Sequence, residues 1–174
     1  LGWLEPNQVQ TITNNGTYTI YPIETANKNL KGLRIPLSTP LLLDNSVFDT
    51  LYLEYRDAIG MDRYMVRLDR DENQQAHPFM NRYKPDGEIN RNGVLGLLRD
   101  SSQDTSNTTT TQLLDMNPTS SFSDGSIKLP GNVGKFADSI LGTGQSYTLP
   151  HNNFTLQTIG KSNDGGMQVR ITFP

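Results

Sequence analysis

The chain has 174 residues, 15 basic and 18 acidic side chains, and a net charge of −3 with a pI near 5.3. This length suits one domain with a sizeable core or two very small ones. The slightly acidic balance gives no strong basic patch and argues against nucleic acid as a partner. The absence of cysteine excludes disulfides, thiolate metal sites and cysteine nucleophiles.

Polar, uncharged residues set the character of the chain. Charged residues make up only 19%, whereas Asn, Thr, Ser, Gln and Gly are abundant, a composition typical of a secreted β protein with long loops. No apolar run approaches the roughly 20 residues needed to span a bilayer. Because the sequence begins with Leu1 and shows no basic region of a signal peptide, we expect a fragment or a processed product.

The first residues are unusually apolar for a chain end. Leu1, Trp3 and Leu4 are residue types that proteins bury, and they stand before Pro6 with no room for a strand. Chain ends are usually polar and frayed. We therefore expect these three side chains to pack against something.

Apolar residues at every second position predict β-strands over most of the chain. The predicted strands cover residues 8–13, 16–23, 31–37, 50–56, 63–68, 93–99, 111–116, 146–149, 153–160 and 167–173. The strand predicted over 8–13 is weak, because Val9 and Ile12 would face opposite sides. The strand predicted over 31–37 is expected to end at its proline, Pro36. In 50–56, Leu51, Leu53 and Tyr55 alternate with polar or aromatic residues, and 93–99 is apolar enough for a buried strand.

Turn signals and one helical stretch complete this outline. "NNG" at 14–16 predicts a hairpin turn, and "KSNDGG" at 161–166 is a strong hairpin signal for the last two strands. A single short helix is predicted over 135–141. The stretches 69–92 and 100–111 are expected to be long polar loops. Short strands separated by turn residues predict an antiparallel β-sandwich, jelly-roll-like or immunoglobulin-like, or a barrel. We expect residues 1–174 to form one such module.

No motif of a hydrolase or a nucleotide-binding protein is present. The sequence lacks HExxH, GxSxG, a P-loop and GxGxxG, and its two histidines, His77 and His151, stand in polar turns. We therefore expect no enzymatic activity from this chain. Glu54 and Arg56, two apart on one predicted strand face, are expected to form a structural ion pair.

Two acidic loops are candidates for calcium, which takes six to eight hard oxygen ligands. The alternation of oxygen-bearing side chains resembles the start of a calcium loop, but the turn glycine and the bidentate glutamate of an EF-hand are missing. Solvated loops are the simpler explanation. The first candidate ligands are Asp69, Asp71 and Asn73, and the second are Asp86 and Glu88.

Several stretches, in their order, resemble a known family. "LGWL", "NNGTYTIYPIE", "LRIPL", "LYLEYRDAIGMD", "LLDMNP" and "FADSILGTGQSYTLPHNNFTLQTIGKSNDGGMQVRITF" are similar to the region after the catalytic domain in gametolysin-like and immune-inhibitor-A-like secreted zinc metalloproteases. The zinc motif of those proteases, HExxHxxGxxH, is absent here. The resemblance therefore implies a secreted, non-catalytic accessory module, with zinc only in a catalytic domain outside this chain.

The resemblance also gives the apolar terminus a role. It implies that residues 1–6 form a seam at which Leu1, Trp3 and Leu4 pack on an upstream catalytic domain or on the base of this sandwich. The module would then help to hold or choose a protein substrate.

Two other functions stay open. The first is a carbohydrate- or cell-surface-binding module, in which seven tyrosines and the acidic loops bind glycan, with or without calcium. Core packing is the simpler role for most of these tyrosines. The second alternative function is that this chain is itself an enzyme. The tyrosines are Tyr18, Tyr21, Tyr52, Tyr55, Tyr64, Tyr83 and Tyr147.

Overall fold

The computed structural model describes residues 4–43, 46–57, 93–101, 111–116 and 139–174. One short 3₁₀ turn, η1 (Pro6–Gln8), precedes the strands. A larger sheet contains β1 (Val9–Thr11), β3 (Gly32–Leu43), β4 (Ser46–Arg56), β5 (Gly93–Arg99), β6 (Thr111–Leu114) and β7 (Leu141–Gly142). A smaller sheet contains β2 (Gly16–Ile20), β8 (Ser146–Thr148), β9 (Thr155–Lys161) and β10 (Met167–Thr172).

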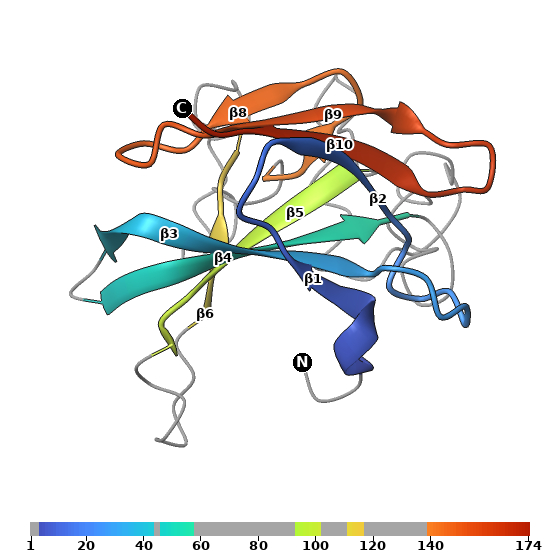
Figure 1. Ribbon diagram of the computed structural model, residues 1–174, viewed down its shortest axis with the longest axis horizontal. Helices are drawn as coiled ribbons and strands as arrows, with labels where there is room; N and C mark the ends of the chain where they lie inside the picture. Colours follow the sequence, from blue (N-terminus) through green and yellow to red (C-terminus); the bar gives the residue numbers. More distant parts are fainter. Residues whose placement is uncertain (1–3, 44–45, 58–92, 102–110, 117–138) are drawn as a thin grey trace, which may run out of the picture.

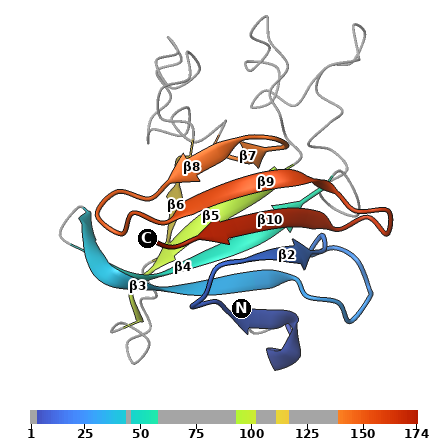
Figure 2. The same cartoon turned by 45° about the horizontal axis from the view of Figure 1, so that its top comes forward.

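The two sheets lie face to face as two layers (Figure 1). The larger sheet has the order β1-β3-β4-β5-β6, with β7 also paired to β5, and the smaller sheet has the order β2-β10-β9-β8. Figure 2 shows the four strands of the smaller sheet side by side in that order. All pairs are antiparallel except β1 and β3, which run parallel. The predicted all-β sandwich is confirmed.

One hydrophobic core fills the space between the sheets. The alternation predicted for β4 is confirmed, because Leu51, Leu53 and Tyr55 are all buried on the inner side. Leu156 and Val169 face them from β9 and β10 and are fully buried. Burial of each such side chain stabilises the fold by about 1.5–3 kcal/mol. Since neighbours along a strand point to opposite sides, the residues between these core positions must lie on the outer faces.

The predicted end of the third strand at Pro36 is wrong. β3 continues to Leu43, and its register to β4 shifts between Pro36 and Leu41. Proline is tolerated at such a bulge because no ladder hydrogen bond is required of its nitrogen. The side chain of Asn152 supports the bulge from the turn after β8. It accepts hydrogen bonds from Ser38 Oγ at 3.1 Å and Thr39 N at 3.0 Å, and donates to Thr39 O at 2.8 Å.

The two turn predictions have different outcomes. The hairpin at 161–166 is confirmed: it joins β9 to β10, and Gly165 adopts a φ of +89° that other residues rarely reach. The hairpin at 14–16 is wrong, because the strands on its two sides lie in different sheets. Asn15 instead holds the end of the chain, with its Oδ1 accepting a hydrogen bond from Phe173 N at 2.7 Å.

The predicted helix over 135–141 is wrong at its described end. Leu141 belongs to β7 and pairs with Val94 of β5, while Ile140 and Leu141 are both buried. Gly93 allows this close approach, since a Cβ there would lie 2.5 Å from Ile140 Cγ2 and from Leu141 O. Residues 135–138 and the predicted strand 63–68 lie outside the described residues. Within the described ranges, no helix has the length and apolar character needed to cross a membrane.

Candidate functional site

A row of side chains crosses the outer face of the larger sheet. The strand registers place Thr11 opposite Arg34, Arg34 opposite Tyr52, Tyr52 opposite Leu97, and Leu97 opposite Leu113. Arg34, Tyr52 and Leu97 each stand next to buried, inward-facing residues on their own strands. Thr11 and Leu113 pair with this row across the ladder, so all five share the side that faces away from the smaller sheet. This face carries an arginine and a tyrosine at the centre of the sheet.

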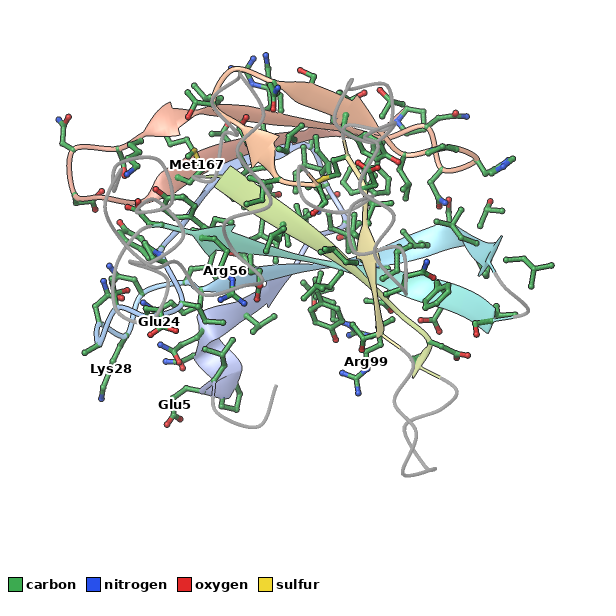
Figure 3. The ribbon with its side chains drawn as sticks, turned by 180° about the vertical axis from the view of Figure 1, so that it is seen from behind. Glu5, Glu24, Lys28, Arg56, Arg99 and Met167 are labelled. Atoms are coloured by element: carbon green, nitrogen blue, oxygen red, sulfur yellow. The ribbon has the colours of Figure 1, made fainter. Side chains whose placement is uncertain are left out.

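The row forms part of a groove of about 500 Å³. The strands β1, β3, β4, β5 and β6 contribute its floor, and the segment before η1 contributes a wall. Figure 1 shows η1 on the outer side of the larger sheet, and Figure 3 shows Glu5 and Arg99 on that same side. The lining residues are Leu4, Glu5, Pro6, Val9, Thr11, Arg34, Tyr52, Leu97, Arg99 and Thr111.

Gln8 holds the wall of the groove in place. Its Oε1 accepts a hydrogen bond from Glu5 N at 3.0 Å, and its own N–H donates to Glu5 O at 2.9 Å. Its Nε2 donates to Asn27 O at 3.2 Å, and its carbonyl accepts from Lys31 N at 2.7 Å. Because Gln8 is buried and bonded on all these sides, the turn that carries Leu4 and Glu5 is tied to the body of the sheet.

Lys31 in turn holds the loop that Gln8 contacts. Its side chain is only 1% exposed, and its ammonium donates to Pro22 O at 3.0 Å, to Thr25 O at 2.9 Å and to Asn27 Oδ1 at 2.7 Å. It also bonds to the hydroxyl of Thr25. A buried cation here is satisfied by neutral oxygens, and it fixes the loop between β2 and β3 next to the groove wall.

The charge of the groove comes mainly from two arginines on its floor. Arg34 forms no ion pair with any described residue, and its Nε is buried without a hydrogen-bond partner. Arg99 lies two strands away on β5, and Tyr52 of β4 stands between the two strands. Glu5 is the one acidic side chain among the lining residues, all of which belong to the described part. An arginine guanidinium stays charged and presents donors in a planar fork that suits a carboxylate.

Glu54 and Arg56 lie further along the same outer face. Arg56 Nη2 and Nε lie 2.7 and 2.8 Å from Glu54 Oε1, so the two side chains form an ion pair. Glu54 is 5% exposed. Since both members are held by each other, this pair is structural.

The other predicted site residues are placed as follows. Leu4, the described member of the predicted seam, is half-buried and lines the groove, while Leu1 and Trp3 lie outside the described residues. The calcium candidates Asp69, Asp71, Asn73, Asp86 and Glu88 also lie outside them. Within the described ranges, no three His, Asp or Glu side chains gather closely enough to hold a metal ion.

The described tyrosines do not form one exposed row. Tyr55 is buried in the core, and Tyr18 and Tyr147 are half-buried against it. Tyr21 donates a hydrogen bond to Asp164 of the β9–β10 turn. Only Tyr52 contributes to the groove. Tyr64 and Tyr83 lie outside the described residues.

A second, apolar hollow of about 440 Å³ lies where the β3 bulge meets β6 and β8. Its lining residues are Thr39, Pro40, Leu41, Leu42, Leu114, Tyr147, Leu149, Pro150 and His151. Leu42 is 71% exposed and stands opposite the exposed Val47 on β4. His151 is exposed, with a φ of +65° in the turn predicted for it. With no charged group to orient a ligand, this hollow offers less chemistry than the groove.

Sequence reasoning did not find the groove. A signal was present, because Arg34 stands between apolar residues of a predicted strand and Arg99 follows the apolar residues of another. The register that brings them to one face could not be read from the chain. Comparison with family models, with curated proteins and with solved structures gives no match. The resemblance to secreted zinc metalloproteases therefore stays a prediction.

Proposed function

We propose that this chain is a non-catalytic accessory module of a secreted, gametolysin-like protease and that its outer-face groove holds a protein segment. The observation that carries the proposal is the groove itself, with apolar and cationic side chains together on the outer face of the larger sheet. The resemblance supplies the protease context. Because Leu4 of the predicted seam lines the groove, an upstream domain would lie beside it and could present a substrate to it.

The groove chemistry favours protein over glycan. Leu4, Pro6, Val9 and Leu97 offer aliphatic contacts and no hydrogen bonds, whereas sugar hydroxyls need many donors and acceptors. A glycan-binding module is the second candidate, because the ring of Tyr52 gives one aromatic surface within the groove. Calcium dependence of either function would rest on the loop acids at 69–73 and 86–88.

Binding of unfolded casein, measured by calorimetry, tests the proposal. Leu97→Glu places a charge on the apolar floor and should abolish binding. Ile159→Glu is the matched control, because Ile159 is exposed on β9 of the other sheet and should leave binding unchanged. Equal affinity of both variants and the unaltered chain would overturn the groove as the site. The chain alone should also leave casein uncleaved, and cleavage that a chelator stops would refute the non-catalytic role.

A further inference from the structure

We propose that the groove recognises an acidic, extended peptide segment, whose carboxylate is bound by the guanidinium of Arg34. This inference rests on the proposed function and names the class of segment that the groove holds.

The first argument is the state of Arg34. Its Nε is buried on the sheet and lacks a hydrogen-bond partner, and Arg34 makes no ion pair with a described residue. A buried donor on a charged group is costly when it stays unpaired. A carboxylate can accept two parallel hydrogen bonds from one guanidinium, which satisfies both partners. Arg34 is therefore a preformed receptor for a carboxylate, because Glu5, the one acidic side chain of the groove lining, forms no ion pair with it.

The second argument is the spacing of the two arginines. Arg34 lies opposite Tyr52, Tyr52 lies opposite Leu97, and Arg99 follows two residues after Leu97 on β5. With strands about 4.8 Å apart and a rise of about 3.4 Å per residue, the two Cα atoms lie about 12 Å apart. In an extended peptide, residues four apart share one side and are separated by about 13 Å. Two acidic residues at this interval match the two arginines.

The third argument is what lies between and beside the charges. The ring of Tyr52 stands between the strands of the two arginines, and Leu4, Val9 and Leu97 add aliphatic surface. Apolar side chains of a peptide can contact this surface while its acidic side chains reach the arginines. The ligand class is therefore an extended peptide with two acidic residues four apart and apolar residues between them. The hydroxyl groups of a neutral glycan would find few hydrogen-bond partners on this aliphatic surface.

The test uses two synthetic peptides, both capped at their ends. One has two glutamates four residues apart with Val and Thr elsewhere, and the other has glutamine at both places. We expect the glutamate peptide to bind at least about tenfold more tightly, since a charge-assisted hydrogen bond is about twice as strong as a neutral one. Its affinity should also fall with added salt, because exposed charges are screened.

Arginine variants then assign the effect. Arg34→Gln should remove most of the preference for the glutamate peptide, and Arg99→Gln should remove part of it. Arg170→Gln is the matched control. Arg170 is exposed on β10 of the other sheet, so the same loss of charge there should change neither affinity. Thermal melts of each variant establish that it remains folded.

The outcomes separate this inference from the proposed function. Equal binding of the two peptides, unaffected by Arg34→Gln but lost in Leu97→Glu, would overturn acidic recognition and leave peptide binding standing. Binding of neither peptide would overturn acidic recognition, and a simultaneous lack of casein binding would overturn both. Binding of an oligosaccharide of uronic acids that depends on Arg34, with no binding of either peptide, would show that the carboxylate receptor serves a glycan and would refute the peptide.

Discussion

Replacement of Lys31 by methionine should destabilise the fold through the loop between β2 and β3. Methionine keeps most of the side-chain volume, so packing changes little. The ammonium and its bonds to Pro22 O, Thr25 O and Asn27 Oδ1 are lost. Pro22 O retains donors from the N–H and hydroxyl of Thr25, at 3.0 and 2.7 Å. Thr25 O is therefore the oxygen that loses its described hydrogen-bond donor in the variant.

The size of the effect follows from these partners. A buried carbonyl left unpaired costs about 1–3 kcal/mol, and hydrogen bonds to a charged group contribute about 1.5–3 kcal/mol each. Relief from burying the ammonium offsets part of this loss. We expect a net loss of about 3 kcal/mol, which in a chain of this size lowers Tm by about 6–12 °C.

Urea denaturation followed by circular dichroism measures this change. Lys28→Met is the matched control, because Lys28 is exposed in the same loop and its side chain points away from the fold (Figure 3). Its substitution should cost less than about 0.5 kcal/mol, as surface changes usually do. If Lys31→Met were as stable as Lys28→Met, the ammonium would not hold the loop. Amide exchange of Thr25 N–H should also accelerate in Lys31→Met alone.

Three further changes test other parts of the fold. Asn152→Ala removes three hydrogen bonds and leaves Thr39 N and O without this partner. Urea denaturation should show that the free energy of unfolding falls by about 2–4 kcal/mol. A decrease below about 0.5 kcal/mol would contradict the role of Asn152 at the bulge. Gly93→Ala forces a Cβ against β7 and should cost about 1–3 kcal/mol in the same assay, whereas an unchanged midpoint would show that β7 does not pack there. Hydrogen bonds from Ser162 and Tyr21 hold the pKa of Asp164 below its usual 3.8, so its stabilising effect is present above about pH 4 and is lost as pH falls through the folded-state pKa. Asp164→Asn should therefore flatten the acid limb of the stability curve, and an acid limb identical to that of the unaltered chain would refute this.

The sequence predicted those features of the fold that depend on residues close to one another in the chain. The strand at 93–99 was placed at its observed bounds, and the alternation in 50–56 identified which side chains of β4 enter the core. The hairpin at 161–166 was found from its turn residues, because Gly165 must adopt a positive φ. In each case the deciding interactions lie within a few residues of one another.

The predictions that were wrong concern features determined by contacts between residues far apart in the sequence. Pro36 did not end β3, because Asn152, more than a hundred residues later, satisfies the backbone of the bulge. The helical pattern near Leu141 was overridden by pairing with β5, which Gly93 makes possible. The groove escaped prediction for the same reason, since it depends on the register between strands rather than on any one strand.

The position of the groove follows from the needs of the core. Leu33 and Ile35 must point inward to meet the smaller sheet, so Arg34 between them must point outward. A charged residue in a central strand is compatible with an open or ligand-covered outer face and is incompatible with a dry second layer. Among the described residues, the wall at η1 covers one side of this face, and Lys31 and Gln8 fix it there. The inner face thus accounts for much of the stability, and the outer face carries a guanidinium that no described residue pairs.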